Sequence, residues 1–457
     1  MKEVTNSKAS VSPARAAAFN ILLRVERESS YASELLHSRA YHYLTKVDHS
    51  LATELVMGVL RWRALLDSEI ASLSSQPIQK LDLEILIALR LGVYQVLWLS
   101  RIPARAVINE SVELVKRARK RSAGAFVNAV LRRVGGSSII RAVNGSSAEQ
   151  LAASSAHPLW LVERWCREYG AAAAQQICRY DQRQPVTAIR LRSAETEERL
   201  RAEGIKLESG FMLSFARRVQ HEDARTSALK EGFCVIQDET SQLVALLVGR
   251  GSRILDCCAA PGGKTLVIAD HNQGAHVVAA DLHPHRVRLM KKLVREDNGT
   301  INNRTGRVDF IAADACALPF GTEFDRILAD VPCSGTGTLA RNPEIKWRLA
   351  PQDIANLQAR QLAILRSAMG RVAAGGRIVY STCSLEREEN EDVMGQVLAG
   401  NSSFCLLDCR TELDRLRAEG VLTLADISSL TSGPYLRTLP GVHRCDGFFA
   451  AILERRG

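Results

Sequence analysis

The feature that most constrains the fold is a series of short, largely apolar runs, each of which ends in a loop of polar or small residues. Three of these runs, at 253–255, 324–328 and 377–380, have the length expected of buried strands. From about residue 237 onward such runs alternate with helical patterns, which is typical of a doubly wound parallel sheet. Loops at the carboxyl ends of parallel strands share one crevice, and ligands bind there.

Two of these loops carry a cysteine in a similar setting. Residues 330–335 read Asp-Val-Pro-Cys-Ser-Gly, and residues 381–384 read Ser-Thr-Cys-Ser. The strand pattern predicts that Cys333 and Cys383 face a common pocket. One thiol of such a pair can attack a substrate while the other assists proton removal and release, and the spacing alone does not choose between them.

A third loop, at 256–265, reads Asp-Cys-Cys-Ala-Ala-Pro-Gly-Gly-Lys-Thr. It is not a phosphate-binding P-loop, because Cys258 stands where that motif needs glycine, and Cys258 and Ala260 likewise replace the first two glycines of a dinucleotide fingerprint. Runs at 277–280 and 308–312 lead to Asp281 and Asp314, which are placed to bind ribose hydroxyls and an adenine amine. A small-residue turn with these two acids predicts a nucleoside cofactor without a pyrophosphate, S-adenosylmethionine.

The positive charge of the chain is concentrated in its first third. Residues 1–145 contain 21 Lys and Arg against 12 Asp and Glu, whereas the other 312 residues contain 39 against 38. Seven positive and no negative residues lie in 116–133, including Lys116, Arg117, Lys120 and Arg121. Such a stretch is either a solvated helix face or a docking surface for a polyanion such as RNA.

Helical periodicity runs through residues 14–134, with segments at 16–28, 48–65, 81–99 and 107–119. We expect three domains: an all-α domain at 1–140, a small α+β RNA-binding or linker domain at 150–235, and an α/β Rossmann-like catalytic domain at 236–457. No apolar run is long enough to span a membrane, and residues 1–12 lack a signal core, which favours a cytoplasmic protein. The eleven cysteines contain no CxxC pair, and 405, 409, 443 and 445 lack a zinc spacing, so we expect reduced thiols and no metal.

At the level of motifs the chain resembles the RNA (cytosine-5) methyltransferases, in particular the Sun/Fmu type that acts on small-subunit ribosomal RNA. The resemblance rests on the loops at 256–265, 324–337 and 380–384, and on Arg-Asn-Pro-Glu-Ile-Lys-Trp at 341–347, Glu-Glu-Asn at 388–390 and Asp-Gly-Phe-Phe at 446–449. It extends to residues 155–160 and to the N-terminal helices, which look like a NusB-type RNA-binding domain. It therefore covers nearly the whole chain.

The resemblance implies which residues act. Cys383 would add to C6 of the cytosine, Cys333 would assist proton removal and release, and Asp330 and Lys264 would assist catalysis, with Lys264 either favouring the thiolate or contacting phosphate. The expected cofactor-binding residues are Cys258, Ala259, Ala260, Pro261, Gly262, Gly263, Lys264, Asp281, Arg286, Asp314 and Asp330. The expected RNA-binding residues are Arg341, Lys346, Trp347, Lys116, Arg117, Lys120 and Arg121.

The sequence is also compatible with two other classes of protein. DNA cytosine-5 methyltransferases use the cysteine of a Pro-Cys pair as nucleophile, which would promote Cys333, although no segment reads as a DNA-recognition insert. A non-catalytic RNA-binding ribosome-assembly factor would need only the N-terminal domain. Within the preferred class, tRNA or another RNA is the alternative substrate, and the chain is expected to act as a monomer.

Overall fold

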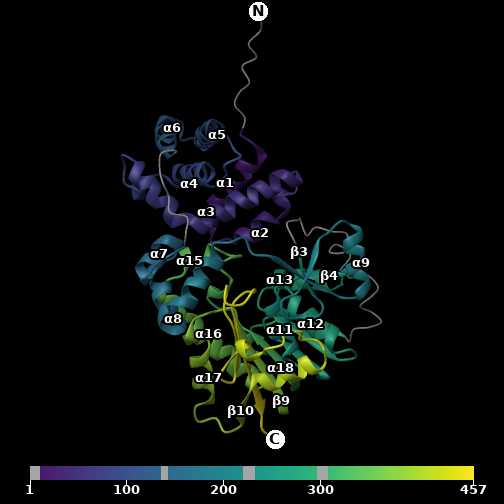
Figure 1. Ribbon diagram of the computed structural model, residues 1–457. Helices are drawn as coiled ribbons and strands as arrows, with labels where there is room; N and C mark the ends of the chain where they lie inside the picture. Colours follow the sequence, from purple (N-terminus) through teal and green to yellow (C-terminus); the bar gives the residue numbers. More distant parts are fainter. Residues whose placement is uncertain (1–10, 135–142, 220–231, 296–306) are drawn as a thin grey trace, which may run out of the picture. The chain divides into compact units, whose positions relative to one another are not determined.

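The computed structural model describes residues 11–134, 143–219, 232–295 and 307–457, and these form two compact units (Figure 1). The first unit contains Met1–Gln184 together with Leu339–Arg348, and the second contains Pro185–Thr338 together with Leu349–Gly457. The region expected as a middle domain is thus divided. Its helices α7 (Ala148–Ser155) and α8 (Leu159–Asp181) belong to the first unit, and its strands and helix α9 (Ala194–Ala202) belong to the second.

The first unit is built from helices, as the periodicity predicts. Apolar positions at three- and four-residue spacing pack into one core, which includes Ile21, Leu55 and Leu91. The helices are α1 (Pro13–Glu28), α2 (Ala32–Leu36), α3 (Lys46–Leu73), α4 (Leu83–Trp98), α5 (Ala104–Arg117), α6 (Gly124–Arg133), α7 (Ala148–Ser155), α8 (Leu159–Asp181) and α15 (Ile345–Arg348).

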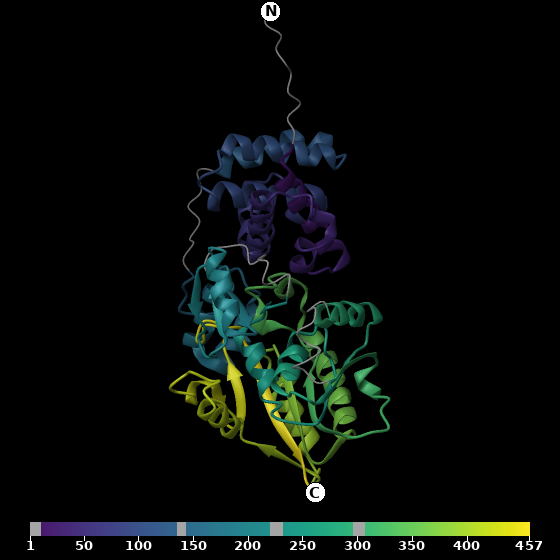
Figure 2. The same cartoon turned by 90° about the vertical axis from the view of Figure 1, so that its right-hand side faces the viewer.

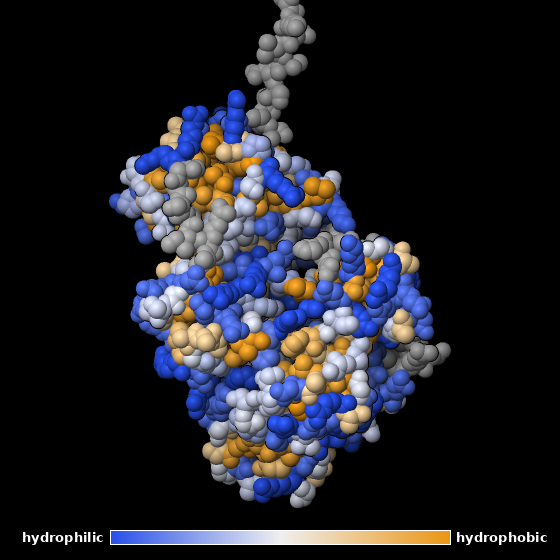
Figure 3. Space-filling view, viewed as in Figure 1, coloured by the Kyte–Doolittle hydropathy of each residue, from blue (hydrophilic) through white to orange (hydrophobic). Residues whose placement is uncertain are grey.

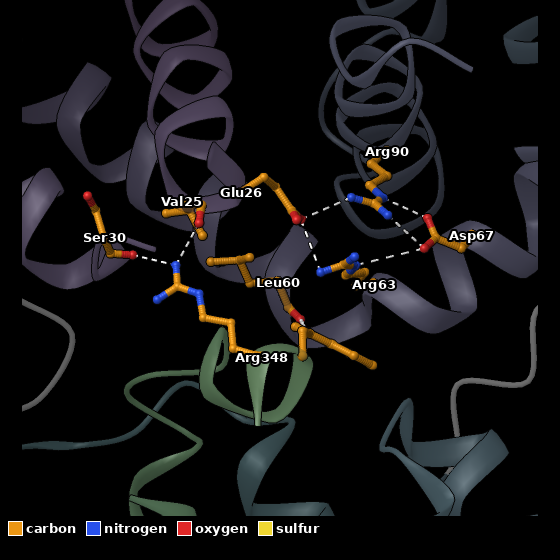
Figure 4. A network of polar contacts seen from close by, with 9 residues as sticks. Val25, Glu26, Ser30, Leu60, Arg63, Asp67, Arg90 and Arg348 are labelled. Atoms are coloured by element: carbon orange, nitrogen blue, oxygen red, sulfur yellow. Dashed lines mark hydrogen bonds and ion pairs between the residues drawn. The ribbon is translucent and has the colours of Figure 1, made fainter. Parts of the chain in front are cut away.

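The segment Leu339–Arg348 joins this unit although it follows the Pro-Cys loop in sequence. Arg348, at the end of α15, donates hydrogen bonds to the carbonyl oxygens of Val25 and Ser30 at 2.7 and 2.6 Å (Figure 4). The indole N–H of Trp347 donates to the carbonyl oxygen of Leu60 at 2.6 Å. These donors occupy backbone acceptors of the first unit, so the segment is an integral part of its packing.

The second unit contains a four-stranded antiparallel sheet in the order β2-β3-β1-β4. Its strands are β1 (Thr187–Leu191), β2 (Leu207–Ser209), β3 (Ala216–Val219) and β4 (Cys234–Ile236), with helix α9 (Ala194–Ala202) between the first two. Ile189, Leu191 and Leu200 are buried in a small core of their own.

The larger sheet of this unit has nine strands, in the order β11-β12-β13-β9-β8-β5-β6-β7, with β10 paired to β13. Five strands are parallel: β5 (Arg253–Asp256), β6 (His276–Asp281), β7 (Val308–Ala312), β8 (Phe324–Asp330) and β9 (Val372–Thr382). β10 (Phe404–Leu407), β11 (Thr431–Ser432), β12 (Tyr435–Thr438) and β13 (Phe448–Arg455) extend it in antiparallel pairing, with β13 drawn in yellow in Figure 2.

Helices cover both faces of the parallel strands, which explains why their sequences are nearly continuous apolar runs. One face packs Leu328 and Val379 against α11 (Glu239–Leu246), α12 (Gly263–His271) and α18 (Cys409–Ala418). The other packs Ile327 and Ile378 against α16 (Pro351–Met369) and α17 (Glu391–Leu398). Helix α13 (Pro284–Arg295) follows β6. Because β5 pairs with both β6 and β8, the strand order reverses there, and ligand crevices form at such points.

Hydrophilic residues dominate much of the face shown in Figure 3, with apolar side chains between them, as is usual for globular proteins. Within the described residues, no helix has both the length and the apolar character needed to cross a membrane. All eleven cysteines are free of disulfide bonds.

Candidate active site

A pocket lies at the carboxyl ends of β5, β6 and β7, where the strand order reverses. Four of the residues expected to bind the cofactor line it: Cys258, Asp281, Arg286 and Asp314. The structure therefore brings together side chains from three separate loops. Sequence reasoning missed Leu282 and His283, which follow Asp281 in the same loop, and also Pro332 after β8 and Arg360 and Ile364 on α16.

The turn after β5 is held close to β6 by backbone contacts. The N–H of Ala259 donates to the carbonyl oxygen of Ala280 at 2.8 Å, and the N–H of Ala260 donates to the Asp281 carboxylate at 3.3 Å. Gly262 precedes α12 with a φ of 109°, a conformation that favours glycine. Small residues here let the backbone itself form the floor beside the pocket.

Lys264 and Asp330 form an ion pair at 2.7 Å between Nζ and Oδ2. Asp330 also accepts a hydrogen bond from the Ser381 hydroxyl at 2.7 Å. Burial opposes the charge on Lys264, but the charge and hydrogen bond of Asp330, with a further contribution from Cys383, hold its pKa above the usual value. Lys264 is therefore an ammonium at neutral pH, close enough to Cys383 for their charges to interact.

The two predicted catalytic thiols meet directly. The Sγ atoms of Cys333 and Cys383 are 3.4 Å apart, one in the loop after β8 and the other in the loop after β9. The hydrogen bond with Cys383, followed by burial and the nearby charge of Glu389, raises the pKa of Cys333 well above its ordinary value. Cys333 consequently keeps its proton at neutral pH and can donate it toward the Cys383 sulfur.

Several residues that hold these loops were not singled out from the sequence. Gln361 and Glu389 are fully buried beside Pro332 and Ser334. The sequence does contain the Glu-Glu-Asn motif at 388–390, but the role of Glu389 follows only from the residues that it contacts in the structure.

Two glycines of the matched motifs permit a close backbone approach. The N–H of Gly337 donates to the carbonyl oxygen of Cys383 at 2.9 Å, and the N–H of Gly447 donates to that of Gly337 at 2.8 Å. A Cβ at Gly337 would lie 2.2 Å from the carbonyl oxygen of Gly447. Any larger residue at 337 would therefore displace the backbone beside Cys383.

The residues expected to bind RNA after the Pro-Cys loop lie in the first unit. Lys346 is only 1% exposed, and its Nζ donates to the carbonyl oxygen of Arg61 at 3.0 Å. Burial lowers the pKa of Lys346 to about 7. Trp347 packs against the helical core, and Arg341 is half-buried. The structure thus buries Lys346 within the first unit, whereas Trp347 is partly exposed.

The basic residues at the junction of α5 and α6 are on the surface. Arg117 and Arg121 are exposed, whereas Lys116 pairs with Glu113 at 2.7 Å and Lys120 pairs with Asp82 at 2.8 Å. Ion pairing reduces the charge that the two lysines offer to a partner. The two arginines are the stronger candidates for phosphate contacts.

Comparison with known proteins agrees with this architecture. The family described as 16S rRNA methyltransferase RsmB/F matches residues 244–454, and the NusB family matches residues 12–135. A probable ribosomal RNA small subunit methyltransferase B of Bacillus subtilis (strain 168) is 34% identical, over 96% of this chain and 98% of its own length. A protein of the same description from Synechocystis sp. is 32% identical, over 97% and 99%.

Solved structures show the same fold. PH0851 superposes with a TM-score of 0.79 at 23% identity, over 98% of this chain and 99% of its own. NSun6 from Pyrococcus horikoshii, solved with SFG, gives a TM-score of 0.55 at 20% identity, over 66% of this chain and 98% of its own.

The fold is therefore that of a Rossmann-like methyltransferase domain joined to a NusB-like helical domain, which confirms the fold class predicted from the sequence. With relatives above 30% identity over nearly the whole chain, the protein belongs to the RsmB/F family of rRNA methyltransferases.

Proposed function

We propose that the protein transfers a methyl group from S-adenosylmethionine to C5 of a cytosine in small-subunit ribosomal RNA, through a covalent bond between Cys383 and C6. The observation that carries the proposal is the 3.4 Å approach of two thiols beside a pocket with strand-end acids. The names of the curated relatives support small-subunit ribosomal RNA as the substrate.

The pocket suits the nucleoside part of this cofactor. Asp281 would accept hydrogen bonds from the ribose hydroxyls and Asp314 would accept one from the adenine amine, while Leu282, Pro332 and Ile364 offer apolar surface to the base. When bound, S-adenosylmethionine would supply an electrophilic methyl group, and the electron pair of the broken methyl–sulfur bond would stay with the departing S-adenosylhomocysteine. Pro332 connects this pocket directly to Cys333.

Cys383 would activate the base, because C5 of cytosine is a poor nucleophile. Its thiolate adds to C6, and the electron pair of the C5–C6 double bond becomes available at C5 to form the new bond to the methyl carbon. The ammonium of Lys264 supports the thiolate form of Cys383, and Asp330 holds Lys264 in place. Asp330 is also available to the N3/N4 edge of the base.

Cys333 would complete the reaction by accepting the C5 proton. The electron pair of the C5–H bond then re-forms the C5–C6 double bond, and the Cys383 sulfur leaves C6 with its own bonding pair. The largest cause of the raised pKa of Cys333 is its hydrogen bond with Cys383. That bond is lost once Cys383 is joined to C6, so Cys333 can release its own proton to water and then, as a thiolate, accept the proton from C5.

Trapping of the protein–RNA adduct tests these roles. Cys333→Ala, incubated with S-adenosylmethionine and unmodified small-subunit ribosomal RNA, is expected to accumulate an adduct that survives denaturation, because elimination lacks its base. Cys383→Ala is the control and is expected to give none. The reverse pattern would assign the nucleophile to Cys333, as in the DNA enzymes, and an active wild type without an adduct in either variant would contradict the covalent route.

A further inference from the structure

We propose that Glu389 is a positioning residue that sets the separation of the two catalytic thiols by binding the residue that follows each of them. The inference deepens the proposed function and rests on it for its catalytic meaning. The separation of the two thiols can be measured without any reaction on RNA.

Glu389 bridges the two cysteine loops. Its Oε1 accepts a hydrogen bond from the backbone N–H of Ser334 at 2.8 Å, and its Oε2 accepts hydrogen bonds from the hydroxyls of Ser334 and Ser384. Ser334 directly follows Cys333, and Ser384 directly follows Cys383. One carboxylate therefore binds the residue next to each cysteine and connects the two loops.

Gln361 adds a second hold on the same loop. Its side-chain amide donates to Glu389 Oε1 at 2.8 Å and to the carbonyl oxygen of Pro332 at 3.0 Å. The residues on both sides of Cys333 are thus fixed by one hydrogen-bonded group that reaches back to α16. Misplacement of Cys333 would require several of these bonds to break together.

Glu389 is itself held rigidly. It has no exposed surface and lies at the end of a short 3-10 helix, Arg387–Glu389. Its carbonyl oxygen accepts a hydrogen bond from the Tyr380 hydroxyl at 2.6 Å, and the next residue, Asn390, donates its side-chain amide to the carbonyl oxygen of Ser384 at 2.9 Å. Hydrogen bonds to strand β9 and to the loop after it therefore hold the backbone of Glu389 in place.

Only a carboxylate suits this position. A buried carboxylate is costly unless its oxygens are hydrogen-bonded, and the donors here are two hydroxyls, one side-chain amide and one backbone N–H, all of them neutral. A glutamine would place an NH2 group against some of these donors. An aspartate keeps the charge but is one methylene shorter, so it cannot reach both loops.

The separation of the thiols is measurable by their oxidation to a disulfide. Diamide removes two hydrogen atoms from the pair, one from each thiol, and is itself reduced to the hydrazine while the S–S bond forms. The full-length protein is treated with diamide, and the rate of formation of the Cys333–Cys383 disulfide is followed by mass spectrometry of the joined peptides. Glu389→Asp is expected to slow this rate at least tenfold, with Glu388→Asp, the partly exposed neighbour, as the matched control.

Two further readouts separate positioning from general damage. Methyl transfer by Glu389→Asp is expected to fall about 100-fold in kcat, since a displacement of about 1 Å can have that effect, while the affinity for S-adenosylmethionine stays as in the wild type.

Should Glu389→Asp fail to fold, the double variant Ser334→Ala/Ser384→Ala removes the hydroxyl contacts from the other side and is expected to slow disulfide formation as well. An unchanged disulfide rate in either folded variant overturns the positioning role. A slowed disulfide rate in Glu389→Asp together with no RNA adduct in Cys333→Ala would instead overturn the covalent mechanism and leave the positioning role standing.

Discussion

At the scale of single residues, Lys264 links the loop after β5 to Asp330 and Cys383. It is the last residue in the matched Gly-Gly-Lys sequence, pairs with Asp330 at 2.7 Å and interacts with the charge of Cys383. Its Nζ also lies 5.2 Å from the centre of the Phe448 ring, in the terminal Asp-Gly-Phe-Phe motif. A cation in this position favours the ionised form of a neighbouring thiol.

Removal of that charge is predicted to change the pH dependence of the reaction. Without the ammonium, the positive charge of Lys264 beside the Cys383 sulfur is lost, so the ascending limb of the kcat–pH profile of Lys264→Met is expected to move to higher pH. Lys264→Arg keeps the positive charge and is the control. An unchanged limb in Lys264→Met would show that the lysine does not support the thiolate and would favour contact with RNA phosphate.

The sequence predicted the positions of some residues of the candidate site and not of others. Asp281 and Asp314 were predictable because each follows an apolar strand whose end must open into the crevice. Glu389 was not, because its role depends on hydroxyls that lie up to 55 residues away in sequence and reach it only through the pairing of β8 with β9. Arg360 likewise enters the pocket from α16, a helix that reads as an ordinary amphipathic segment.

At the scale of elements, the parallel strands were placed correctly to within a few residues. Apolar continuity identified β7 at its observed bounds, and β5, β6 and β8 extend beyond the predicted runs into polar residues such as Asp256 and Asp330. Strand β9 also begins five residues earlier than predicted, in a stretch that ends in Gly375 and Gly376. The assignment of 339–348 to the first unit was not predictable. Its bonds join residues some 300 positions apart, for which local periodicity holds no signal.

The junction of α5 and α6 is predicted to contact RNA phosphate. The double variant Arg117→Ala/Arg121→Ala is expected to weaken binding to small-subunit ribosomal RNA and to reduce the slope of log K against log salt by roughly 1 to 2, because each phosphate contact contributes about 0.7 to 0.9. Binding would be measured by filter retention over a range of salt concentrations.

Two control variants sharpen this test. Lys346→Met alters a buried lysine of the same unit and Arg410→Ala removes an exposed arginine of the other, and both are expected to leave the salt slope unchanged. If Lys346→Met reduced the salt slope, or if the double arginine variant left it unchanged, the RNA contact would lie in the 341–347 motif instead. Point variants are preferable to deletion of residues 1–140, which would strip Trp347 and α7 of the helices that they pack against.

At the scale of the whole molecule, charge and chemistry are divided between the two units. Most of the excess positive charge lies in residues 1–145, and the thiols and the cofactor pocket lie in the second unit. The sequence predicted this division because net charge and strand pattern are both local properties. The chain nevertheless passes from one unit to the other soon after Cys333 and returns ten residues later, so the boundary is not a single linker.

Transfer of the methyl group to C5 requires that the hydrogen on C5 be released, and this release can be measured. Unmodified small-subunit ribosomal RNA carrying tritium at C5 of its cytosines would be incubated with the full-length protein and S-adenosylmethionine, and tritium released to water would be compared with methyl groups incorporated. We expect about one tritium released for each methyl group transferred. Methyl incorporation without tritium release would place the modification at another atom and would rule out C5 as the site of methylation.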